Sequence, residues 1–346
     1  MKCWTFILSL IFFSNAYAQS AANDSIKPEY RKIYSQCLNA NIPQALALLP
    51  ASGKLSPKDD AFVKNFKARF AFDTDRSDYI NNHHSAIDSL LLLFQPYWRK
   101  SLLDTAADYE EELTSSLRQF WGADKNTTLD SLGTLFKSYI ASHHYFTTNG
   151  IGKTGKLFDL LIWKNQVDTV YRFAVNKEKI AVRVVLMKQF VTLGWEEYAT
   201  LEEYYPGGWA TDSALHCVID AYDRNSESFL ISYLAHEGRH FKDYKRFPHL
   251  KSEDLEYRAK LTELSMANKE LYSLIQFFIS NGIKDAENSH SAANYRVIHD
   301  LSKMLFHKEW EASMDEWKKI PVSTTNRAAY KIFRKNTRYL QKHPPV

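Results

Sequence analysis

The sequence predicts an α+β fold that is predominantly helical, with a small antiparallel sheet between two helical regions. Apolar residues recur every three or four positions from about residue 27 to 161, and again from residue 227 onward, which is the spacing of amphipathic helices. Between these regions, residues 170–187 are rich in β-branched side chains and residues 209–222 alternate apolar with polar side chains, as strands do. With 346 residues, 45% of them hydrophobic, the chain can bury a large core.

The first 18 residues have the pattern of a secretory signal. Lys2 precedes an apolar run over residues 4–13, and residues 16–18 read A-Y-A, a cleavage pattern. We therefore expect cleavage before Gln19 and a periplasmic or secreted mature protein. The run is too short to span a bilayer and no later run is long enough, so no transmembrane anchor is expected. Whether Cys37 and Cys217 form a disulfide in that compartment is not specified by the sequence.

Residues 19–165 are expected to form a helical N-terminal region. Helical spacing is clearest over residues 85–98, 109–121 and 129–140. Near its end, residues 150–157 read GIGKTGKL, which resembles a phosphate-binding loop but has Leu157 where that loop requires a hydroxyl. We expect a flexible linker there. The net charge of +4 is modest and no block of like charge occurs, so a nucleic-acid partner is not expected.

Residues 166–346 are expected to form a second domain that begins with the sheet. Strands at 170–175 and 180–187 flank a polar turn and predict a hairpin, and residues 209–222 predict a third strand. A helix follows from residue 227 and ends before Pro248. The next helix is predicted from Ser252, its N-cap, to about residue 280, and another begins near His290.

The helix that starts near residue 227 carries the motif H-E-x-x-H, formed by His236, Glu237 and His240. Histidines four residues apart lie on one side of a helix, close enough for both imidazoles to bind one metal ion. Glu237 projects near that face, where a general base for the attacking water would stand. The alternative is a helix that carries two histidines by chance.

A catalytic zinc site usually has three protein ligands and one open position, so a third ligand is needed. The motif helix rises about 8 Å beyond His240, and a helix returning from Ser252 descends about 6 Å to Glu256. Glu256 therefore reaches the level of the histidines. Glu263 lies on nearly the same face but about 10 Å deeper, and Glu253 stands at the helix start. Asp243 is either a carboxylate that orients a ligand histidine or a solvated helix-end residue.

HEGRH followed by E-Y-R-A-K-L-T-E-L resembles the gluzincin class of zinc metallopeptidases over about residues 168–280. In that class a glutamate on the next helix, often within E-x-x-A, is the third ligand. The resemblance implies a zincin-like catalytic domain, Zn²⁺ bound by His236, His240 and Glu256, and Glu237 as the base that activates water. It also implies a peptide or protein substrate that pairs with an edge strand of the sheet. Arg239 inside the motif and Lys260 four residues after Glu256 depart from the thermolysin pattern, and no named subfamily fits.

Peptide hydrolysis also needs a donor for the oxyanion. His290 and Tyr295 are the candidates, and the alternative is that Tyr295 packs and His290 caps a helix. A rival interpretation of the whole chain is a catalytically inactive zincin-like binding or scaffold protein of the cell envelope, with Arg239 or Lys260 folded into the site. A third is a purely helical interaction protein with an accidental motif. The peptide sequence, endo- or exo-cleavage and the oligomeric state are not specified by the sequence.

Overall fold

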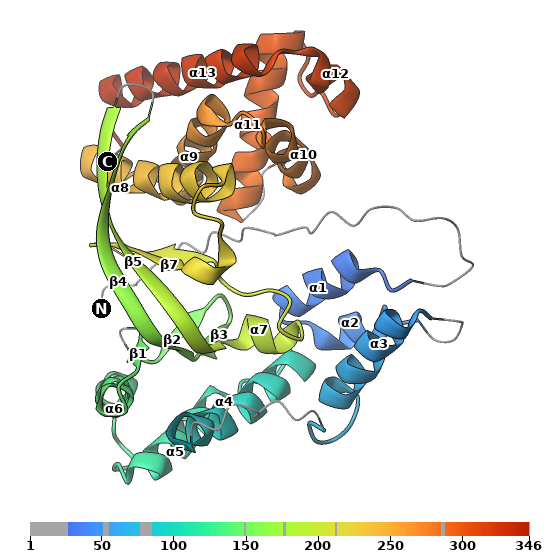
Figure 1. Cartoon of the computed structure of the whole chain (residues 1–346), viewed down its shortest axis with the longest axis vertical. Helices are drawn as coiled ribbons and strands as arrows, with labels where there is room; N and C mark the ends of the chain where they lie inside the picture. The colour runs from blue at the N-terminus through green and yellow to red at the C-terminus, as the bar shows by residue number, and fades with distance from the viewer. Residues whose placement is uncertain are drawn as a thin grey trace. The chain divides into compact units, whose positions relative to one another are not determined.

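The computed structural model describes residues 27–50, 55–76, 85–148, 150–175, 178–211, 213–284 and 288–345. The expected signal, residues 1–18, lies outside the described residues. The chain is a mixed α+β protein with more helix than strand, as predicted (Figure 1). It divides into two compact units. Unit 1 comprises the residues up to Val167 together with Met187–Gly207, and unit 2 comprises Asp168–Leu186 and Gly208–Val346.

Unit 1 is built mainly from helices around an aromatic core. Phe66, Phe94, Trp98 and Phe136 are almost completely buried there. The side chains of Ser56 and Thr128 accept backbone N–H groups and cap two of its helices. Its helices are α1 (Tyr30–Leu38), α2 (Ile42–Ala47), α3 (Pro57–Phe70), α4 (Ser85–Leu103), α5 (Glu110–Trp121), α6 (Leu129–Ser142) and α7 (Trp195–Ala199).

The stretch GIGKTGKL is a hairpin, so its prediction as a flexible linker was wrong. Strand β2 (Gly152–Thr154) pairs antiparallel with β3 (Leu157–Asp159). The hairpin is tied to α7, because the Trp195 indole N–H donates to the Thr154 carbonyl (2.8 Å) and the Trp195 backbone N–H donates to Oδ1 of Asp159 (2.9 Å). These tertiary bonds fix a segment whose glycines and lysines alone indicate a loop.

The sheet has five strands in the order β1-β4-β5-β7-β6. The predicted hairpin is confirmed, but its strands β4 (Leu161–Val175) and β5 (Glu178–Leu193) are longer than expected. Residues 164–169 of β4, which precede the predicted strand, are mostly exposed and polar, so their composition does not indicate a strand. A two-residue strand, β1 (Phe146–Thr147), pairs with the start of β4.

The third predicted strand, residues 209–222, was wrong in extent. It consists of β6 (Gly208–Ala210) and β7 (Leu215–Val218), which pair with each other, followed by a 3₁₀ turn at Ile219–Ala221. Thr211 makes the turn between the two strands, because its N–H and hydroxyl donate to the Ala214 carbonyl and its hydroxyl accepts the Ala214 N–H.

The rest of unit 2 is helical. Helix α9 packs against α8, α11 and α13 and is buried on most sides (Figure 1). Leu261, Ile275, Val297 and Trp317 form part of the core around it. The elements are a π-helical segment (Ser228–Ala235), α8 (His236–Arg246), α9 (Ser252–Met266), α10 (Leu271–Asn281), α11 (Ser289–Phe306), α12 (Met314–Lys319) and α13 (Val322–Lys342).

Two details of the predicted helices were wrong. The helix expected from Ser252 to about residue 280 is broken at Ala267, whose backbone is extended and whose carbonyl, like that of Leu264, accepts from the Asn326 amide. The N-cap of α9 is Lys251 and makes no side-chain capping bond, so Ser252 is the first helical residue.

Cys37 and Cys217 are both buried, and neither forms a disulfide. Among the described helices, none is both long and apolar enough to cross a membrane.

Candidate metal centre

The two motif histidines lie at a change of helix type. The eight residues before His236 form a π-helix, and a regular α-helix begins at His236 itself. π-Helical turns are rare and are found frequently at functional sites. Gly238 allows the sheet to approach here, because a Cβ on it would lie only 2.7 Å from the Phe173 ring of β4. Local backbone and packing therefore fix the direction in which the first turn of α8 presents its side chains.

His236, His240 and Glu256 converge in the interior of unit 2. Nε2 of His236 lies 3.4 Å from Oε2 of Glu256, and Nε2 of His240 lies 3.3 Å from Oε1 of the same carboxylate. One ligand atom from each residue lies within 4.8 Å of the others. All three residues are buried. The structure thus brings together the three residues that the sequence selected as metal ligands.

The atoms that face one another in this cluster lack hydrogen bonds. Among the described residues, Nε2 of His236 and Nε2 of His240 are buried without a hydrogen-bond partner; Oε2 of Glu256 is also buried without a hydrogen bond, although Nδ1 of His290 lies 3.0 Å away. A buried polar atom left in that state costs on the order of 1–3 kcal/mol. Two imidazole nitrogens and one carboxylate around a common point form a donor set that suits Zn²⁺. The cluster could therefore hold a metal ion, which would satisfy all three atoms.

Glu263 completes the environment of His236. Its Oε1 lies 2.5 Å from Nδ1 of His236, and both side chains are buried. A carboxylate in this position fixes the ring orientation and the tautomer that leaves Nε2 free for a metal. The sequence signal was available: Glu256 and Glu263 are seven residues apart and so share one face of α9. The greater depth of Glu263 on α9, which separates it from the third-ligand position, places it against the second nitrogen of His236.

The charged groups of the cluster shift one another's pKa values. Burial alone would lower the pKa of His236, but the carboxylates of Glu263 and Glu256 outweigh it and raise that pKa to about 10. Burial alone would raise the pKa of Glu256, but His240, together with contacts from His236 and His290, holds it well below its usual value. The carboxylates thus attract positive charge into the cluster, and a metal cation would take the place of the imidazole proton.

Glu237 adjoins His236 in the sequence, and His290 contacts Glu256. Glu237 is completely buried and follows His236 directly in the first turn of α8. His290 lies in the first turn of α11, with Nδ1 3.0 Å from Oε2 of Glu256 and about a third of its side chain exposed. The alternative that His290 caps the helix was wrong, because the N-cap is Asn288, which accepts the N–H groups of His290 and Ser291.

Tyr295 has a packing role. Its ring stacks on those of His299 and Trp310, with centroid distances of 5.9 and 5.0 Å. This is the alternative that the sequence left open for Tyr295. Of the two candidate oxyanion donors, only His290 has a polar contact with the metal cluster within the described part of the chain.

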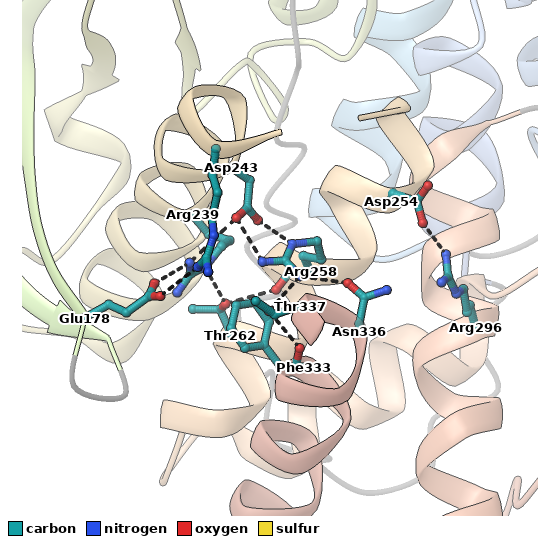
Figure 2. Close-up of polar contacts among 11 residues, drawn as sticks. Glu178, Arg239, Asp243, Asp254, Arg258, Thr262, Arg296, Phe333, Asn336 and Thr337 are labelled. Carbon is teal, nitrogen blue, oxygen red and sulfur yellow. Dashed lines mark hydrogen bonds and ion pairs between the residues drawn. The ribbon is translucent and has the colours of Figure 1, made fainter. Parts of the chain in front are cut away.

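Arg239, the unusual charge inside the motif, makes its contacts elsewhere (Figure 2). Its Nη1 donates to Oε2 of Glu178 at 2.7 Å, its Nε donates to the Thr262 hydroxyl at 3.2 Å, and its guanidinium lies over the Phe333 ring. The arginine therefore does not occupy the position of a metal ion.

Asp243 does not orient a ligand histidine, and it is not solvated. It is buried and accepts two hydrogen bonds from Arg258, from Nε at 2.7 Å and from Nη2 at 2.9 Å (Figure 2). Both interpretations of this residue were wrong. Its position, three residues beyond His240, directs it to the side of α8 that faces Arg258, while Glu263 takes the role considered for it.

Lys260 lies close to the cluster. Its Nζ is 4.0 Å from Oε2 of Glu256 and lies over the Phe278 ring, and the side chain is buried. A cation this close to a ligand carboxylate competes with a metal for the same negative charge.

Comparisons of the chain with protein-family models, with curated proteins and with solved structures found no match.

Proposed function

We propose that this chain is an exported zinc-dependent metallopeptidase with a zincin-like catalytic domain in unit 2. The observation that carries the proposal is the convergence of His236, His240 and Glu256 on one buried point, next to the motif glutamate Glu237. Export rests on the signal pattern of residues 1–18. The zincin-like fold rests on the order of elements, in which a small sheet precedes the motif helix and the next helix carries the third ligand.

Bound zinc supplies the Lewis acidity that makes water a nucleophile near neutral pH and polarises a peptide carbonyl. His236, His240 and Glu256 would hold it, and Glu263 would keep His236 in the required tautomer. Glu237 takes a proton from the attacking water and delivers it to the amine that leaves when the C–N bond breaks. The imidazole of His290 is the nearest candidate to donate a hydrogen bond to the oxyanion.

Replacing the proposed base tests this function. Glu237→Gln removes the proton acceptor but keeps the size of the side chain, so peptide cleavage should fall about 10²- to 10⁴-fold while zinc content is unchanged. Cleavage is measured on a broad peptide library by mass spectrometry, and zinc by elemental analysis. Glu253→Gln, an exposed change at the start of α9, is the matched control. Cleavage by zinc-loaded Glu237→Gln at the parental rate would refute the mechanism.

One observation favours a second candidate, a zincin-like binding or scaffold protein of the cell envelope without catalytic activity. Lys260 places a buried cation 4.0 Å from the proposed ligand Glu256. If that charge excludes zinc, the purified parental protein contains no stoichiometric metal and cleaves no peptide in the library. Zinc together with cleavage supports the peptidase and contradicts the scaffold protein.

A further inference from the structure

A second concave site in unit 2 is distinct from the metal cluster. It is a cavity of about 210 Å³ between α8, α13 and the end of the β4–β5 hairpin. Arg239 and Arg246 line it from α8, and Arg334 and Arg338 line it from α13. Glu178 is the one acidic residue among the described lining residues, which gives the lining a formal charge of +3. None of the three proposed metal ligands lines this cavity.

The two arginines of α8 share the single acid. Nη1 of Arg239 lies 2.7 Å from Oε2 of Glu178, and Nη1 of Arg246 lies 3.5 Å from Oε1 of the same carboxylate. Arg239 is buried, whereas Arg246 and Glu178 each expose about a third of the side chain. Oδ1 of Asp243 also lies 3.8 Å from Nη1 of Arg239, but both oxygens of Asp243 accept hydrogen bonds from Arg258, and Asp243 does not line the cavity (Figure 2). Within the described lining, one carboxylate therefore faces two guanidinium groups.

The two arginines of α13 have no acid partner. Within the described ranges, no carboxylate lies at ion-pair distance from Arg334 or Arg338. Tyr330, Arg334, Arg338 and Gln341 follow one another at spacings of four, four and three, so α13 presents them along one face. Both guanidinium groups are exposed and turned toward a hollow that already contains excess positive charge.

We propose that this cavity, the arginine pocket, binds the phosphate group of a small anionic ligand. Guanidinium groups bind the oxygens of phosphate through paired N–H donors, and several of them around one hollow match a dianionic group better than a carboxylate. The cavity is smaller than the 300 Å³ or more that is typical of sites for drug-sized ligands, so the occupant is small. Tyr330, Phe333 and Val175 provide an apolar wall for the rest of a phosphate ester.

Calorimetric titration of the full chain with inorganic phosphate, at constant ionic strength, tests the arginine pocket. The double variant Arg334→Gln and Arg338→Gln should bind phosphate at least about tenfold more weakly, because it loses two charged donors. The matched control is Lys331→Gln with Lys335→Gln, which removes the same charge from exposed positions of the same helix outside the lining. It should keep the parental affinity, because long-range charge effects are screened at physiological salt.

Two results would overturn the proposal: parental affinity in the arginine variant, or an equal loss in the lysine control. Phosphate that coordinates a metal at His236, His240 and Glu256 is unaffected by either change, so the difference between the variants reports on the arginine pocket alone. A parallel titration with glycerol phosphate identifies the source of the group. Tighter binding of the ester favours a phosphorylated small molecule, and tighter binding of inorganic phosphate favours the free anion. None of these results depends on peptidase activity.

Discussion

Nδ1 of His236 and Oε1 of Glu263 lie 2.5 Å apart in the interior of unit 2, on two helices that pack together. Because this bond occupies one nitrogen of the ring, the other nitrogen is left facing Glu256 and His240. Glu263 thus holds His236 in the orientation that the proposed metal site requires.

Removing this carboxylate should weaken metal binding without removing a ligand. We expect Glu263→Gln to lower zinc affinity about 10- to 100-fold, the usual effect of losing a carboxylate that orients a ligand histidine. Competition with a chromogenic chelator measures the affinity, and circular dichroism checks that the helices are retained. Glu253→Gln on the same helix should leave the affinity unchanged. Equal affinities for Glu263→Gln and the parental protein would show that Glu263 does not orient His236.

Replacing Lys260 should strengthen zinc binding, whereas replacing Glu263 should weaken it. Its ammonium lies 4.0 Å from Oε2 of Glu256, so Lys260→Met removes a positive charge that repels a bound cation. We expect zinc affinity to rise roughly tenfold, measured by the same chelator competition. Lys251→Met, an exposed change just before α9, serves as the control. Weaker zinc binding by Lys260→Met would mean that the lysine instead holds Glu256 in place.

The bond between Asp243 and Arg258 should be important for stability rather than for metal binding. Asp243→Asn leaves the guanidinium of Arg258 buried without its counter-charge, which typically costs about 3–5 kcal/mol. Urea unfolding measures this loss. Asp254→Asn provides the comparison, because Asp254 pairs with Arg296 at a partly exposed site where about 1 kcal/mol or less is expected (Figure 2). A similar small loss for both variants would contradict a structural role for the buried pair.

Unit 1 contains buried carboxyl groups that should make stability depend on pH. Burial, with the nearby charge of Asp159, raises the pKa of Glu196 to about 8, and burial raises that of Asp159 to about 6. The folded state therefore keeps protons that the unfolded state releases from about pH 4.5 upward. Stability should fall as pH rises from that value to about 8, by at most about 1.4 kcal/mol per pH unit for one proton.

Glu196→Gln should weaken this dependence, because the amide stays neutral at every pH, while the contribution of Asp159 remains. Thermal unfolding of the parental protein and the variant at about pH 5 and about pH 8 measures the effect, with the exposed change Glu203→Gln as the control. The same decline with pH in the parental protein, the variant and the control would mean that Glu196 does not retain its proton in the folded state.

The sequence predicted the helices and the hairpin where local pattern and tertiary structure agree. Its predictions were wrong where contacts between residues far apart in the sequence determine the local structure. The polar stretch of β4 and the hairpin β2–β3 form strands because neighbouring strands and Trp195 supply hydrogen bonds that no local pattern shows. The break at Ala267 depends on Asn326, which lies far along the chain.

In the candidate site, too, some positions follow from local pattern and others depend on tertiary packing. The positions of His236, His240 and Glu256 follow from helix geometry, since four-residue spacing and a returning helix are enough to bring them to one level. The partners of Asp243 and Arg239 were not predictable in this way, because they depend on how α8 faces α9, α13 and Glu178 of β5. Glu263 lies between these cases, because its spacing from Glu256 was visible but its target nitrogen was not.

The central claim, that these three residues form a zinc site, is tested most directly by anomalous X-ray scattering at the zinc edge from crystals of the zinc-loaded protein. The account predicts one strong peak bonded to Nε2 of His236, Nε2 of His240 and a carboxylate oxygen of Glu256, at about 2.0–2.2 Å from each. Zinc bound elsewhere in the crystallised protein, or no anomalous peak between these residues, would contradict the claim that they form a zinc site.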